Sequence, residues 1–260
     1  MDAKLRRLDT NKGRVYVTGD SEANWQLYPS VTTILSILPK TKLIEIEKSI
    51  GAERLKELGR KGALRGTAMH LFLENYFICL KKYPEDRSKC LLYTQRKSTD
   101  QLLHEMDAEF VKIGRSLFYK IESSGVFDDI KKVLYNEKFL FSAHGFAGAS
   151  DFGYLSITND IVIIDFKSAS AIRDEETING YKLQLAAYVI AFEERVKKKV
   201  DRTELWIGHP DGFQHVILQG EELEEYKIKF INLCKLFHKT WDSSHFYEEL
   251  RNELLLKQSI

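Results

Sequence analysis

Cysteine and proline are scarce in this chain of 260 residues, which has three cysteines and four prolines. The cysteines, Cys79, Cys90 and Cys234, lie far apart in the sequence. Three scattered thiols support neither a framework of disulfides nor a four-cysteine iron–sulfur cluster. We therefore expect no iron–sulfur cluster, and we expect reduced, buried thiols of the kind that intracellular proteins carry.

A long uncharged apolar run is also missing. The most apolar helical stretch, residues 71–80, is interrupted by Glu74 and Asn75, and no apolar signal-peptide core follows the charged first residues. The sequence therefore predicts no membrane association and an intracellular location, with no organelle-targeting segment visible. A strong excess of one charge is absent too, because the formal net charge is +1. A polyanionic partner would thus have to meet local clusters of positive charge.

The chain does contain enough apolar material for a sizeable core, since 43% of its residues are hydrophobic. Helical and strand-like patterns predict an α/β fold, in which helices flank a mixed central β-sheet. We expect one domain over residues 1–260. It would comprise an N-terminal strand and helical extension over 1–62, a core over 63–220 and C-terminal helices over 221–260.

The predicted elements follow hydrophobic period and turn residues. After a polar break at 83–88, one long helix is predicted near 100–122. The strands are expected near 14–18, 130–142, 146–157, 160–167, 203–208 and 213–218, the last two joined by a turn at Asp211. The other helices are expected near 30–38, 42–58, 63–82 and 175–198, with a helical remainder from 221 to about 256.

Two short segments carry the most informative chemistry. Gly148 to Asp151 lies in one predicted strand, and Asp165 to Lys167 ends the next, directly after the apolar run 161–164. Side chains alternate along a strand, so Asp165 and Lys167 share one face. A turn near residue 159 would fold the two strands into a hairpin and bring Asp151 to the same place. The sequence therefore predicts two carboxylates and an ammonium at one site.

Paired carboxylates supply the hard oxygen ligands that Mg²⁺ or Mn²⁺ prefers, and they leave coordination positions open for water and a phosphate oxygen. The backbone carbonyl of Phe166 is placed to be a further ligand. Lys167 would orient a water molecule or stabilise a developing oxyanion. Taken alone, an Asp-x-Lys triplet is far more typical of a surface ion pair at a strand end than of a metal site.

Two further motifs flank this pair. The segment from Arg65 to His70 opens the apolar helix, and Gln184 lies one helical turn before Tyr188 in a second apolar helix. Each has a plain structural interpretation when it is taken singly. His70 can be a hydrogen-bonded core residue, and Gln184 with Tyr188 can be ordinary packing.

Together, the motifs resemble the RecB-like branch of the PD-(D/E)XK nuclease superfamily. The family pattern is G-x-x-x-H, then G-x-x-D, then (D/E)-x-K, then Q-x-x-x-Y, which matches Gly66 to His70, Gly148 to Asp151, Asp165 to Lys167 and Gln184 to Tyr188. Residues 28–35 are also similar to the P-S-V-T-x-I-L opening of the mitochondrial genome maintenance exonucleases and their phage and bacterial relatives. The resemblance implies a restriction-endonuclease-like core. The expected intracellular location is either the cytoplasm of the cell that encodes the protein or, for a phage-encoded protein, the cytoplasm of the host.

The resemblance also implies roles for individual residues. His70, Asp151 and Asp165 would ligate the metal ion, Lys167 would be catalytic, and Gln184 with Tyr188 would support the site. Glu137 lies where some relatives place an additional acid near the metals, and a solvated strand residue is the competing interpretation.

The implied activity is that of a Mg²⁺- or Mn²⁺-dependent exonuclease on single-stranded DNA that leaves 5′-phosphates. A duplex exonuclease or a flap endonuclease of the same superfamily is the first alternative. A non-enzymatic nucleic-acid-binding module on the same fold is the second, although Asp151, Asp165 and Lys167 are all present. Protein partners are not indicated by the sequence.

DNA contacts are expected from two segments. Ser30, Thr32 and Thr33 at a predicted helix start could hold phosphate through hydroxyls and backbone amides, with Trp25 and Tyr28 upstream to stack on bases. An ordinary helix cap is the alternative. The basic series that leads into the His70 helix, above all Arg60, Lys61 and Arg65, would neutralise further phosphates, or it would form a solvated helix face.

Overall fold

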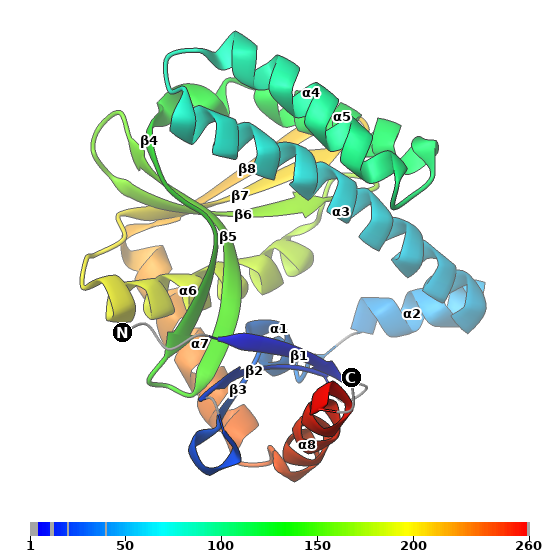
Figure 1. Cartoon of the computed structure of the whole chain (residues 1–260), viewed down its shortest axis with the longest axis vertical. Coiled ribbons are helices and arrows are strands. Elements are labelled where there is room, and N and C mark those ends of the chain that lie inside the picture. Colours follow the sequence, from blue (N-terminus) through cyan, green and yellow to red (C-terminus); the bar gives the residue numbers. More distant parts are fainter. Residues whose placement is uncertain (1–4, 11–12, 20, 40, 259–260) are drawn as a thin grey trace.

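The computed structural model describes residues 5–10, 13–19, 21–39 and 41–258. A five-stranded sheet flanked by helices forms its centre (Figure 1), which confirms the predicted α/β class with a mixed sheet and an N-terminal helical region. Among the described helices, none combines the length and the apolar character that a membrane span requires.

The central sheet has the order β4-β5-β6-β7-β8. Its strands are β4 (Ile130–Ser142), β5 (Phe146–Ser156), β6 (Ile161–Ser168), β7 (Arg202–His209) and β8 (Gly212–Gln219). Strands β4, β5 and β6 form the predicted antiparallel meander. Strand β7 pairs parallel to β6, because the crossover helix α6 (Glu175–Val196) returns the chain to the end of the sheet at which β6 begins. Strand β8 then closes an antiparallel hairpin with β7.

Helices cover both faces of this sheet (Figure 1). On one face lie α3 (Ala52–Lys82), α4 (Arg87–Leu103) and α5 (Ala108–Glu122), with the 3-10 turn η2 (Val126–Asp129). On the other lie α6 and α7 (Gly220–His238). Helices α3 and α5 pack closely because Gly114 has no side chain: a Cβ there would lie 2.4 Å from the Cβ of Ala68.

The N-terminal part of the chain forms a separate three-stranded antiparallel sheet. Its strands are β1 (Arg6–Thr10), β2 (Gly13–Thr18) and β3 (Gln26–Pro29), with the 3-10 turn η1 (Glu22–Asn24) before β3. The short helix α1 (Val31–Leu35) and then α2 (Thr41–Ile50) follow, and α8 (Ser244–Gln258) packs near this sheet (Figure 1). A single parallel bridge between Ser30 and Ala147 attaches the small sheet to β5.

Two predictions about the helices were wrong in their boundaries. The predicted break near 58–63 lies instead at Gly51, whose φ of 82° belongs to the left-handed region that glycine adopts freely. Helix α3 therefore runs through Gly59 and Gly62 without interruption. The predicted helix near 100–122 is two helices, because α4 ends at Leu103 and α5 begins at Ala108. The strands β1 and β3 and most of α4 were not predicted.

Candidate functional site

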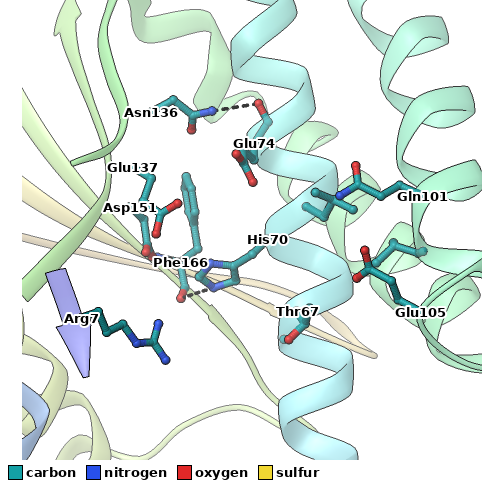
Figure 2. Close-up of a pocket in the computed structure, with 13 residues that line it drawn as sticks. Arg7, Thr67, His70, Glu74, Gln101, Glu105, Asn136, Glu137, Asp151 and Phe166 are labelled. Carbon is teal, nitrogen blue, oxygen red and sulfur yellow. Dashed lines mark hydrogen bonds and ion pairs between the residues drawn. The ribbon is translucent and has the colours of Figure 1, made fainter. Parts of the chain in front are cut away.

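A cavity of about 320 Å³ lies where β5 and β6 separate, between the N-terminal sheet and α3. Strand pairing between β5 and β6 ends at Phe152 and Ile164. Beyond that point the two strands diverge, and the space between them becomes the cavity. An adjoining cavity of about 480 Å³ extends toward α4 (Figure 2). Both are lined by Arg7, Gly66, His70, Glu137, Asp151 and Phe166.

Asp165 and Lys167 project from β6 into the smaller cavity, as the strand alternation predicts. The Lys167 ammonium contacts the Asp165 carboxylate as an ion pair, and the Asp165 side chain is only 2% exposed. Burial raises the pKa of Asp165, and the nearby Asp151 raises it further, although Lys167 acts in the opposite direction. Burial lowers the pKa of Lys167, but the charges of Asp165 and Asp151 outweigh burial, so this pKa lies above its ordinary value. Lys167 is therefore cationic at neutral pH.

The side chain of Asp151 on β5 bonds to β6 just beyond the last backbone pair of the two strands. Its Oδ2 accepts a hydrogen bond from the backbone amide of Phe166 over 2.8 Å. The carboxylate thus holds β6 at the point where the two strands diverge, and it faces the cavity at the same time (Figure 2). The hairpin predicted from the sequence does bring Asp151 to the neighbourhood of Asp165 and Lys167.

His70 reaches the same place from α3. Its Nε2 lies 3.0 Å from the carbonyl oxygen of Phe166, and its Nδ1 lies 3.9 Å from Oδ2 of Asp151. A carbonyl oxygen only accepts hydrogen bonds, so Nε2 carries the hydrogen in this contact, and Nδ1 is the ring nitrogen on the side of Asp151. The Phe166 carbonyl is thereby the group that orients His70 (Figure 2); a contribution of this oxygen to a metal site stays a prediction.

The donors at this site fit a hard divalent cation. Imidazole nitrogen and carboxylate oxygen bind metals at about 2.0 to 2.2 Å, so Nδ1 of His70 and Oδ2 of Asp151, which are 3.9 Å apart, can contact one ion together. Oδ2 of Asp165 is buried, and it is the oxygen that the Lys167 ammonium contacts. In the described part of the chain, no three His, Cys, Asp or Glu side chains already converge as a cage, so Asp165 would have to turn from Lys167 toward the ion.

Gln184 and Tyr188 form a buried pair at the floor of the cavity. The amide of Gln184 donates a hydrogen bond to the Tyr188 hydroxyl over 2.7 Å. The Tyr188 ring lies against β5, where a Cβ on Gly148 would come within 2.7 Å of its Cε1 atom. Both motif glycines lie where a side chain would be crowded. Gly148 leaves room for the Tyr188 ring, and a Cβ on Gly66 would lie 3.3 Å from the Ser168 hydroxyl.

Glu137 borders both cavities and has an unusual backbone (Figure 2). Its φ of 50° is left-handed, and the pairing of β4 with β5 passes from Asn136 to Lys138 without it. Such strain in a non-glycine residue is common at functional sites. Burial raises the pKa of Glu74, and the charge of the nearby Glu137 raises it further. The structure places Glu137 at the site, and its role there stays a prediction.

Of the three hydroxyls predicted to hold phosphate, those of Ser30 and Thr33 make hydrogen bonds that stabilise the fold. Ser30 caps α1, because its Oγ accepts a hydrogen bond from the Thr33 amide. Thr33 donates to the Arg14 carbonyl and accepts from the Arg14 amide, which fastens α1 to β2. Ser30 and Thr32 also line the smaller cavity. Trp25 is only 6% exposed and packs on Tyr247, so the prediction that it stacks on bases was wrong.

The predicted basic series divides into two groups. Arg60 and Lys61 are exposed and pair with Glu57 on their own helix. Arg65 is partly buried, and its Nε donates to the Ser168 hydroxyl over 3.4 Å. Sequence analysis missed Arg7 and Arg14, which line the smaller cavity from the N-terminal sheet.

Comparison with known proteins adds little to this geometry. No family model matches the chain, and no curated protein matches it. Among solved structures, SSO0001 has a TM-score of 0.31 and 13% identity over 68% of this chain and 76% of that chain. A protein of Eubacterium rectale named a "putative exonuclease" has a TM-score of 0.37 and 12% identity over 62% of this chain and 64% of that chain. These likenesses are too remote to support an argument, so function must be argued from the site itself.

Proposed function

We propose that this chain is a divalent-metal-dependent nuclease that hydrolyses phosphodiester bonds in single-stranded DNA from a free end and leaves 5′-phosphates. The observation that carries the proposal is that one cavity gathers two acids, an imidazole and a lysine from three separate elements. They are His70 of α3, Asp151 of β5, and Asp165 and Lys167 of β6. A purely structural ion pair needs neither the cavity nor the imidazole directed into it.

The chemistry of the site follows from its donors. A bound Mg²⁺ or Mn²⁺ ion would supply Lewis-acid activation of the phosphate and of the attacking water. Asp151, Asp165 and His70 are the residues that would hold it. Lys167, kept charged by its acidic neighbours, can donate hydrogen bonds to a phosphate oxygen as negative charge develops there. The water oxygen bonds to phosphorus and gives up a proton, the bond from phosphorus to O3′ breaks, and O3′ takes up a proton to become a hydroxyl. The phosphate stays on the 5′ side of the next nucleotide.

The preference for a single strand rests on the motif resemblance and on the walls of the cavity. Arg7 and Arg14 from the N-terminal sheet border the same space as Gly66 and His70 from α3. The reacting phosphate would therefore lie between two parts of the chain. A flexible single strand can enter such a space more easily than a stiff duplex.

The test uses single strands labelled at either end, blunt duplexes and flapped duplexes, each with Mg²⁺, Mn²⁺ or a chelator. We expect metal-dependent loss of the single strand, and loss of activity in Asp151→Asn. Asp100→Asn, an exposed change on α4, is the matched control and should retain activity. Normal turnover in the chelator or in purified Asp151→Asn would reject the proposed site.

The same substrates separate the alternatives. Faster cleavage of a blunt duplex would identify a duplex exonuclease, and cleavage at the base of a flap would identify a structure-dependent endonuclease. Binding of nucleic acid with no cleavage under any metal would leave a non-enzymatic binding module.

A further inference from the structure

Two arginines beside the cavity have no carboxylate partner among the described residues. Arg65 contacts only the Ser168 hydroxyl through its Nε, and Nε of Arg173 is buried without a hydrogen-bond partner. Arg60 and Arg202, by contrast, pair with carboxylates: Arg60 with Glu57, and Arg202 with Asp129, Asp160 and Glu204. An unpaired guanidinium in a partly buried place is costly, so the absence of partners at two neighbouring arginines requires an explanation.

The two side chains affect each other. Burial lowers the pKa of the Arg65 guanidinium, and the positive charge of Arg173 lowers it further. Two like charges therefore lie near one another, and both side chains are partly buried. An anion between them would relieve both the repulsion and the missing hydrogen bonds.

The backbone around this pair is held in place. Gln214 of β8 accepts a hydrogen bond from the Arg173 amide over 2.9 Å and donates one to the Arg173 carbonyl over 3.0 Å. Arg65 is fixed on the long helix α3. Ser168 directly follows Lys167 on β6 and lines the smaller cavity. Arg65 therefore contacts a residue that lines the cavity, and Arg173 lies close enough to Arg65 for its charge to act on it.

We propose that Arg65, Arg173 and the Ser168 hydroxyl form a subsite that binds a second phosphate of the nucleic-acid strand, next to the phosphate that is cleaved. This inference rests on the proposed nuclease function. Guanidinium groups suit phosphate because they donate parallel hydrogen bonds to two of its oxygens and always carry charge. The phosphate belongs either to an internal linkage or to the 5′ end of the strand.

The experiment compares the full chain with Arg65→Gln, Arg173→Gln and the double variant. Binding to fluorescent single strands with a 5′-phosphate or a 5′-hydroxyl is measured in Ca²⁺ over a range of salt. Each single change should weaken binding on the order of 10-fold and reduce the log–log salt slope by about 0.7. Arg96→Gln, an exposed arginine on α4, is the matched control with unchanged affinity.

The substrate arms identify the phosphate. Equal losses on both strands assign the subsite to an internal linkage, and a loss confined to the 5′-phosphorylated strand assigns it to the end. Losses in Arg65→Gln and Arg173→Gln no larger than that in Arg96→Gln would overturn the subsite, while cleavage by the unaltered chain would still support the nuclease.

A measurement without nucleic acid separates the two proposals. Inorganic phosphate should raise the melting temperature of the unaltered chain and not that of the double variant, which should itself fold normally because neither arginine loses a carboxylate partner and the bond from Arg65 to Ser168 is long, at 3.4 Å. An arginine-dependent rise in a chain that cleaves no nucleic acid would keep the anion site and reject the nuclease. No rise at all, with unchanged strand binding in the variants, would remove the subsite.

Discussion

Lys167 has both a structural contact and a proposed chemical role, because it pairs with Asp165 and lines the cavity. Lysine donates hydrogen bonds but does not bind cations. We therefore expect Lys167→Ala to lower kcat by about 10² to 10³ and to keep its affinity for Mn²⁺, since one competitor for Asp165 is removed. Turnover assays with calorimetric Mn²⁺ titration test this, and the exposed Lys198→Ala is the control. Loss of Mn²⁺ binding in Lys167→Ala would show that our division of roles is incorrect.

Gly148 shows how a motif glycine can act through space alone. A Cβ there would lie 2.7 Å from Cε1 of Tyr188 and 3.2 Å from Val31, and a rigid ring cannot move away easily. Gly148→Ala should therefore destabilise the protein by about 1 to 3 kcal/mol and lower activity by displacing Tyr188. Gly180→Ala is the control, because its Cβ would meet nothing within 4 Å and alanine favours a helix by roughly 1 kcal/mol. Equal stability of the two variants in denaturant unfolding would contradict the packing argument.

At the scale of elements, the sequence predicted the strands of the central sheet well and the helices less well. Strands β4 to β8 are apolar runs bounded by turn residues, which is a local signal. Helix α4 was missed because its buried stripe, Cys90, Thr94, Ser98 and Leu102, is largely small and polar. The buried Ser98 hydroxyl is satisfied by a hydrogen bond that it accepts from Asn75 of α3. This face of α4 is buried only because α3 packs on it. The sequence of α4 has no periodic pattern of apolar residues from which that burial could be predicted.

Strand β7 carries a buried charge, Glu204, that links stability to pH. Burial raises the pKa of Glu204, but hydrogen bonds from His215, Arg202 and Trp206, at 2.7 to 2.9 Å, outweigh burial and hold this pKa below its ordinary value. A lowered folded-state pKa means that the carboxylate contributes stability above its unfolded-state pKa and loses it as the pH falls through the folded value.

We therefore expect Glu204→Gln to lower the free energy of unfolding at pH 7 by about 1 to 3 kcal/mol, because the buried hydrogen bonds to its carboxylate weaken while Arg202 keeps Asp129 and Asp160. The difference from the unaltered chain should shrink as the pH falls below about 4.3. Denaturant unfolding from pH 7 to pH 3 measures it. Glu224→Gln, which removes an exposed partner of Lys227, should cost less than about 1 kcal/mol. A constant difference at every pH would show that charge is not the cause.

At the scale of the whole molecule, the candidate site combines a local part and a distant part. Asp151, Asp165 and Lys167 lie on neighbouring strands of one hairpin, so alternation and a turn were enough to predict their meeting. Arg7 and Arg14 reach the cavity only because the N-terminal sheet docks on β5. That docking depends on packing between segments more than a hundred residues apart, and no periodicity or spacing in either segment indicates it.

The docked N-terminal sheet leads to the last prediction. Its arginines border the cavity from one side and α3 borders it from the other, so a strand that reaches the acids has chain on both sides. If the strand enters by its end, circular single-stranded DNA should resist digestion, and the same circle cut once should be degraded. Both substrates have one sequence and differ only in a free end, so composition and base preference cannot cause a difference. Rates in Mg²⁺ and Mn²⁺ are compared at equal nucleotide concentration. Equal rates would mean that the strand can enter sideways, and the chain would then act as an endonuclease at the same catalytic residues.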